Sequence, residues 1–204
     1  MLASTVAACG GGGAGSETPA GSQRDEERAA SLLARARAEK KPEPYRRLVS
    51  RFRDTNAAAE GRDELAQLLV DEARALLKAS DFSTADDRAE EATLYAGVDL
   101  TQAARAVQQD IDDARAERAA KRAIENASAG KCASALKAVA DPVRAKARQH
   151  FKTALKDKTK AALFGCLEQK LAEEVKAGNV EAARSLLTAP DTTTAFDKES
   201  YAKL

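Results

Sequence analysis

Residues 129–135 read AGKCASA and residues 177–183 read AGNVEAA, and these two heptapeptides decide how the chain folds. A third stretch, residues 79–85, reads ASDFSTA and keeps the same order: alanine, a small turn residue, a polar residue, an apolar residue, two variable residues and alanine. Gly130 and Gly178 free the backbone to turn, because glycine has no Cβ to clash. The pattern predicts three helical hairpins.

Each junction has three positions with distinct roles. The small residue makes the turn, the apolar residue closes the mouth of the hairpin, and the last alanine lets the second helix pack closely against the first. The turn residues are Ser80, Gly130 and Gly178, the apolar residues are Phe82, Cys132 and Val180, and the alanines are Ala85, Ala135 and Ala183. Because one hairpin cannot bury its own apolar face, we expect neighbours to stack.

The composition also favours helices. Alanine accounts for 47 of the 204 residues, whereas the chain has two isoleucines, nine valines and no tryptophan. Alanine is the best helix former, and β-branched residues are the ones enriched in strands. Collagen, disulfide-dense miniproteins and multi-span membrane proteins are excluded by composition. We therefore expect an all-α fold, with hairpins stacked as a short α-solenoid or as an irregular helical bundle.

Apolar residues at helical spacing place the helices along the chain. Pro44 is expected in a first turn, where proline is tolerated. The expected helices contain residues 29–36, 45–52, 57–79, 82–96 and 101–129, a further one marked by Val143, Ala147, Phe151 and Leu155, and another over 163–175.

The amino terminus cannot pack in the same way. Residues 10–22 read GGGGAGSETPAGS and hold six of the eleven glycines, a composition typical of a flexible tether. Directly before them, Val6, Ala7, Ala8 and Cys9 resemble the lipobox of bacterial lipoproteins. The resemblance implies signal-peptidase recognition at the first three residues and lipidation of the Cys9 thiol, with several acyl chains anchoring the protein to a bilayer. Gly10 after the cysteine resembles the sorting pattern for an outer membrane.

A complete secretory signal also needs a basic segment and an apolar stretch. Only eight residues precede Cys9, and they include no lysine or arginine. We therefore expect the coding start to lie upstream of Met1. The alternative is a cytosolic protein with an Ala/Gly-rich amino terminus.

The junctions resemble the G-x-[aromatic]-x-x-A hinge of tetratricopeptide (TPR) repeats. The aromatic is lost at Cys132 and Val180, and the junctions recur about every 50 residues, where the family has 34. Residues 45–69 also resemble repeats of envelope lipoproteins such as outer-membrane assembly and Tol-Pal accessory proteins, with Arg53 where a proline is expected. These resemblances imply degenerate TPR-like repeats. A generic antiparallel bundle, whose hairpins also need glycine and alanine, is the alternative.

Catalytic chemistry is not indicated. The one histidine, His150, lacks the companions that a zinc site requires and is expected on an exposed helix surface. Adjacent acidic pairs are interpreted as solvated helix faces, because a helix brings together residues three or four apart. These pairs are Asp86-Asp87, Glu90-Glu91, Asp112-Asp113 and Glu173-Glu174. We expect no enzyme activity, no cofactor, no metal and no small-molecule substrate.

Cys132 and Cys166 are the two thiols left in the domain if Cys9 carries lipid. In an oxidising compartment a disulfide is their expected fate. A regular stack would place Cys166 about 16 Å along its helix from the hairpin mouth, too far for a bridge. Either an irregular segment over 142–160 brings the thiols together, which we favour, or they stay apart.

Charge is balanced overall at +1 but segregated along the chain. Residues 24–53 carry a net +5, residues 81–117 a net −7 and residues 118–160 a net +9. Such blocks suit attraction between neighbouring helices, and a basic block can also face anionic headgroups or nucleic acid. Solvated faces are the common explanation, and nucleic acid is not expected because aromatic interleaving is missing.

These observations divide the chain into a signal-peptide remnant (1–8), a lipidated cysteine with its linker (9–23), a TPR-like helical domain (24–190) and a carboxyl-terminal tail (191–204). The expected protein is a non-catalytic scaffold that binds another envelope protein. It would be held by Cys9 to a bacterial membrane, the outer membrane facing the periplasm being favoured. The alternative is a cytosolic helical bundle that binds nucleic acid or an acidic partner through residues 118–160.

Overall fold

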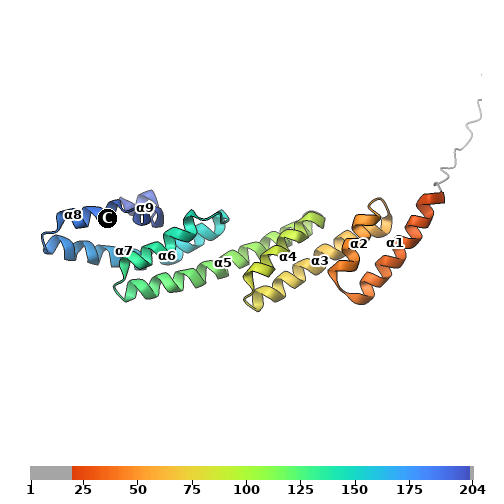
Figure 1. The fold of residues 1–204 in the computed structure, drawn as a ribbon, viewed down its shortest axis with the longest axis horizontal. Helices are drawn as coiled ribbons and strands as arrows, with labels where there is room; N and C mark the ends of the chain where they lie inside the picture. Colours follow the sequence, from red (N-terminus) through yellow and green to blue (C-terminus); the bar gives the residue numbers. More distant parts are fainter. Residues whose placement is uncertain (1–19, 203–204) are drawn as a thin grey trace, which may run out of the picture. The chain divides into compact units, whose positions relative to one another are not determined.

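Ten helices and no strand form residues 20–202, the part of the chain that the computed structural model describes (Figure 1). The expected all-α class is confirmed. The helices are α1 (Ala20–Glu39), α2 (Pro42–Arg51), α3 (Asn56–Lys78), α4 (Phe82–Tyr95), α5 (Val98–Ser128), α6 (Cys132–Arg144), α7 (Gln149–Lys176), α8 (Val180–Thr188), α9 (Pro190–Ala195) and α10 (Lys198–Tyr201).

The helices belong to two compact units, Met1–Leu65 and Ala66–Leu204, with the boundary inside α3. In the first unit, α1 packs along α2, which begins at Pro42 and carries Pro44 in its first turn as expected. Glu26 on α1 accepts hydrogen bonds from the backbone N–H groups of Asn56 and Ala57, both at 3.2 Å. An α1 carboxylate thus satisfies two of the four N–H groups that are left without a helical partner at the amino end of α3.

Polar contacts and a glycine fix the packing inside this first unit. Arg37 on α1 forms ion pairs with Glu60 and Glu64 on α3, and the Tyr45 hydroxyl donates to Glu64 at 2.9 Å. Gly61 lies so close to the fully buried Leu48 that an added Cβ would be 2.6 Å from Leu48 Cδ2. Close approach of α2 and α3 therefore depends on the absence of a side chain at residue 61.

In the second unit, the three predicted turns share one backbone geometry. Ser80, Gly130 and Gly178 have φ angles of +62°, +71° and +74°. Each turn residue donates its N–H to the carbonyl three residues back, and the next residue donates to the carbonyl five residues back. This is the Schellman arrangement, which satisfies the last carbonyls of a helix. The turns lie between α3 and α4, between α5 and α6, and between α7 and α8.

The other junction positions differ among the three hairpins. Ala85 and Ala135 are fully buried and Ala183 is 7% exposed, in agreement with close helix packing. Cys132 is buried and Phe82 is half-buried, as a residue closing a hairpin mouth should be. Val180 is 59% exposed, so the prediction that it closes the third mouth is wrong. The backbone turn repeats, whereas burial depends on what packs over it.

The main core of this unit lies between α5, α6, α7 and α9. α7 packs along α5 and α6, and α9 covers α6. Alanines of α5 face leucines of α7, which lets the two helices approach closely. The core residues are Ala116, Ala120, Ala123, Ala135, Leu136, Val139, Leu155, Leu163, Leu167, Ala195 and Phe196.

One predicted helix is wrong. Val143, Ala147, Phe151 and Leu155 do not share a helix, because α6 ends at Arg144 and α7 begins at Gln149. The spacing of four residues continues in phase across the break, so periodicity cannot detect it. Ala145, the capping residue directly after α6, has an extended backbone with ψ of 161°.

The residues expected to form a carboxyl-terminal tail pack on the domain instead. α9 and α10 lie within residues 190–201, and Phe196 is 5% exposed in the core beside leucines of α7. The folded part of the chain therefore extends past residue 190. At the other end, α1 starts at Ala20, inside the segment expected as a linker.

Candidate functional site

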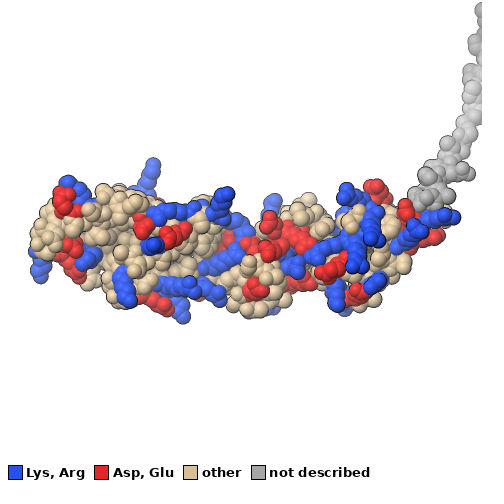
Figure 2. All heavy atoms as spheres, in the orientation of Figure 1, with Lys and Arg blue, Asp and Glu red and all other residues tan. Residues whose placement is uncertain are grey.

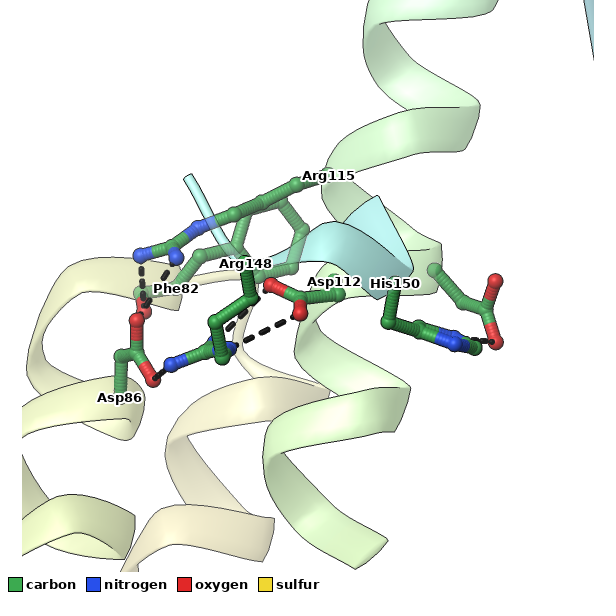
Figure 3. Close-up of polar contacts among 7 residues, drawn as sticks. Phe82, Asp86, Asp112, Arg115, Arg148 and His150 are labelled. Atoms are coloured by element: carbon green, nitrogen blue, oxygen red, sulfur yellow. Dashed lines mark hydrogen bonds and ion pairs between the residues drawn. The ribbon is translucent and has the colours of Figure 1, made fainter. Parts of the chain in front are cut away.

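Four charged side chains form a network between α4, α5 and the segment joining α6 to α7 (Figure 3). Arg148 donates from Nε and Nη2 to the two oxygens of Asp112, each at 2.9 Å, and from Nη1 to Asp86 at 2.8 Å. Arg115 donates to the other oxygen of Asp86 at 2.8 Å and to the carbonyl of Phe82 at 2.9 Å. We call Asp86, Asp112, Arg115 and Arg148 the ionic cluster.

Asp112 is buried, and its carboxylate therefore needs a cationic partner inside the protein. The Asp112 side chain is only 4% exposed, and a buried carboxylate is costly unless it is paired and hydrogen-bonded. The hydrogen bond to Asp112, with that to Asp86, holds the pKa of the Arg148 guanidinium above its ordinary value, against the opposing effect of burial. The cluster therefore contains two positive and two negative groups in fixed contact.

The local backbone explains how Arg148 reaches both carboxylates. Arg148 is the residue before α7 and has an extended conformation, with φ of −60° and ψ of 148°. It lies in the break between α6 and α7, and its side chain reaches Asp86 on α4 and Asp112 in the middle of α5. The helix break that the sequence did not predict is thus the feature that positions the ionic cluster.

A cavity of about 230 Å³ adjoins the cluster and is also lined by Lys146, Ala147 and Phe151. This volume is below the roughly 300–1,000 Å³ of ordinary ligand pockets. Both carboxylates in its wall already accept hydrogen bonds from arginines. The arrangement therefore has the properties of a structural junction that holds three segments together.

One residue of the ionic cluster, Asp112, lies where the sequence interpretation did not place it. The interpretation of Asp112-Asp113 as a solvated pair is wrong for Asp112, which is 3% exposed. Its spacing of four and eight residues from Ala116 and Ala120, both buried, is the signal that could have placed it on the inner face of α5. His150 is exposed as expected, with Nε2 3.2 Å from Asp113 Oδ2.

Cys132 and Cys166 lie at disulfide distance, with Cα atoms 5.7 Å apart. Both are buried, at 7% and 8% exposed. The favoured alternative from the sequence was a pair brought together by irregular stacking, and the helix lengths explain how this happens. α6 has 13 residues and α7 has 28, so Cys132 at the start of α6 lies beside the middle of α7. The turn between α5 and α6 therefore lies beside the middle of α7 and not beside the turn between α7 and α8.

The predicted lipidation residue Cys9 and the recognition residues Val6, Ala7 and Ala8 lie outside the described residues. Within residues 20–202, no three His, Cys, Asp or Glu side chains are grouped so that they could hold a metal ion. None of the helices in that range is both long enough and apolar enough to cross a bilayer.

Comparison with known proteins gives no relative. No protein-family model matches the chain, and neither the curated proteins nor the solved structures include a match. The fold defines an all-α protein built of helical hairpins.

Proposed function

We propose that the chain is a non-catalytic, lipid-anchored scaffold of the bacterial cell envelope, with degenerate TPR-like hairpins that bind another envelope protein. Cys9 carries the lipid after cleavage behind Val6-Ala7-Ala8, and the Gly-rich segment is the tether. The favoured location is the periplasmic face of the outer membrane.

The observation that carries the proposal is the pair Cys132 and Cys166, buried at bridging distance. Such a pair supports residence in an oxidising compartment, since disulfides persist outside the cytosol and are rare inside it. In an exported protein, a lipobox-like cysteine directly before a Gly-rich segment supports attachment to a membrane through lipid. Three hairpins with equivalent turns further support a stacked binding scaffold.

Fractionation of cells that make the full-length chain tests the proposal. The wild-type chain should be found with membranes, and mass spectrometry should show an acylated amino-terminal Cys9. Cys9→Ser should release the chain into the soluble fraction, because the anchor is lost. Cys166→Ser is the matched control, since it removes a thiol without touching the anchor. The membranes are washed with about 1 M NaCl before fractionation, because salt at that concentration screens ionic contacts with headgroups. If Cys9→Ser stays on the washed membranes as the wild type does, the proposal is wrong.

Thiol labelling of the same cells tests the compartment separately. The proposal expects Cys132 and Cys166 to resist alkylation until a reductant is added. Alkylation of both without reductant, together with an unprocessed Met1, would instead support the cytosolic alternative. That alternative assigns the binding role to the basic segment 118–160.

A further inference from the structure

The charges of the second unit are unevenly distributed. Residues 66–204 carry 22 basic and 22 acidic residues, yet residues 118–160 alone hold twelve Lys or Arg against three Asp or Glu. This segment covers the last third of α5, all of α6 and the first 12 of the 28 residues of α7. A neutral unit therefore has a strongly basic middle.

Ion pairs inside the chain neutralise only part of this excess. Arg144 pairs with Asp141 and Asp191, Arg148 belongs to the ionic cluster, and Lys160 pairs with Asp197. For the other basic side chains of the segment, the described part of the chain places no carboxylate at ion-pair distance. These are Arg118, Lys121, Arg122, Lys131, Lys137, Lys146, Lys152, Lys156 and Lys158.

Four of these side chains lie along the last third of α5 and at the turn into α6. Arg118, Lys121 and Arg122 are spaced i, i+3 and i+4 on α5, so they lie on neighbouring positions of one helix face. Lys131 follows at the turn into α6, and all four are exposed. Figure 2 shows Lys and Arg side chains along this part of α5 and at the turn, with acidic side chains among them. We call these four residues the basic ridge.

An exposed apolar residue lies beside the basic ridge. Ile124 is 37% exposed and is one helical turn from Lys121. Glu117 and Glu125 are the carboxylates on the same stretch of α5. A helix that presents basic side chains next to an exposed aliphatic one suits a bilayer interface, where cations meet phosphates and apolar groups enter the boundary of the acyl chains.

Nucleic acid fits this surface less well. Binding of single strands uses aromatic side chains on which bases stack. The aromatic ring at the ridge is that of Phe82, which is half-buried, and the Arg118 guanidinium lies over it at 4.8 Å from the ring centroid. That ring face is therefore already occupied by a cation of the chain itself.

We propose that the basic ridge, with Ile124, docks the domain on the headgroups of anionic phospholipids. The biological setting rests on the proposed function, because a membrane tether keeps the domain close to a bilayer and raises the effective concentration of headgroups. The binding itself does not depend on the tether. Docking would orient the hairpins of the second unit relative to the membrane.

Vesicle sedimentation with the purified full-length chain tests the docking. The chain carries Cys9→Ser, so no acyl chain contributes to binding. It should bind phosphatidylcholine vesicles that contain phosphatidylglycerol and not vesicles of phosphatidylcholine alone. Binding should weaken as NaCl is raised from about 0.1 M to 1 M, because the Debye length falls from about 10 Å to about 3 Å.

Charge variants locate the surface. Lys121→Gln, Arg122→Gln and Lys131→Gln together should weaken partitioning by about 100-fold, since each basic residue near an anionic surface contributes about fivefold. Arg118 is retained because of its contact with Phe82. The control removes three charges from the first unit, with the substitutions Lys41→Gln, Arg47→Gln and Arg53→Gln, and should change partitioning much less.

The apolar contribution has its own variant. Ile124→Ser should weaken partitioning about threefold at low and high salt alike, because burial of aliphatic area is not screened by ions. Circular dichroism of each variant confirms the helical fold before binding is measured.

Three results would overturn the docking proposal: equal binding to neutral vesicles, equal losses in the ridge and control variants, or displacement from vesicles by an oligonucleotide that binds more tightly. None of these results bears on acylation of Cys9, which the fractionation experiment measures.

Discussion

Replacing Arg148 by methionine tests the ionic cluster directly. Methionine keeps an unbranched apolar stem and removes the guanidinium. Asp112, whose side chain is 4% exposed, would lose both hydrogen bonds of 2.9 Å, whereas Asp86 would keep its contact with Arg115. The variant therefore leaves one buried carboxylate without its partner.

The size of the effect follows from the burial of the two groups. Removing one partner of a fully buried ion pair costs about 3–5 kcal/mol. Because the Arg148 side chain is 38% exposed, water can reach part of the site, and we expect a loss of about 2–3 kcal/mol in the free energy of unfolding. Arg144→Met is the control, since Arg144 and its partner Asp191 are 41% and 35% exposed. That variant should cost about 0–1 kcal/mol.

Urea denaturation followed by circular dichroism measures both variants, and a double-mutant cycle isolates the pair. The double variant Asp112→Asn, Arg148→Met should lose less free energy of unfolding than the two single variants lose together. Each single change leaves the other member of the pair without this partner, and the double variant removes both charged groups. The reasoning is refuted if Arg148→Met costs no more than Arg144→Met, or if the two single costs simply add.

Two further predictions concern a pair of helical glycines and a buried tyrosine. Gly61→Ala should lower the free energy of unfolding by about 1 kcal/mol. The new Cβ would be 2.6 Å from Leu48 Cδ2, and such overpacking costs about 1–3 kcal/mol. This cost outweighs the gain in helix propensity of about 1 kcal/mol. Gly165→Ala, with no atom within 4 Å of the new Cβ, should stabilise by about 0.5–1 kcal/mol in the same urea denaturation. Burial and the hydrogen bond to Glu64 raise the pKa of Tyr45 to about 12, so phenolate absorbance compared between the wild type and Tyr45→Phe should show a titration near pH 12. Since an unfolded tyrosine has a pKa of about 10, the Tyr45 contribution to stability should be intact below pH 10 and lost as pH rises through 12.

Each of these predictions has an outcome that contradicts it. Equal stability of the two alanine variants would mean that Leu48 moves aside without cost. A Tyr45 midpoint at the ordinary value would mean that the hydroxyl is open to water in solution.

The helical hairpins could be predicted because their signals are local. Ser80, Gly130 and Gly178 adopt positive φ angles at the predicted turns, and the alanines of α4 are buried as their spacing indicated. A left-handed turn residue and an apolar period of 3.6 act over a few residues, so no knowledge of the neighbouring helices is needed.

The candidate site could not be predicted, because it depends on contacts between distant residues. Asp112 and Arg148 are 36 residues apart, and the helix break that positions Arg148 leaves the apolar spacing in phase. Their charges alone are equally compatible with two solvated side chains. The opposite error occurs at Val180, where the junction sequence predicts a buried side chain and the structure shows one that is 59% exposed.

The amino-acid sequence by itself determined the all-α class and the positions of three hairpin turns, because helix propensity, periodicity and turn geometry are properties of short segments. Only the tertiary structure decided which Cys, Asp and Arg side chains meet. The relative lengths of α6 and α7 set Cys132 beside Cys166, and the packing around α5 made Asp112 a buried carboxylate that requires a cation. The register between helices depends on every contact along them, and no single segment of the chain encodes it.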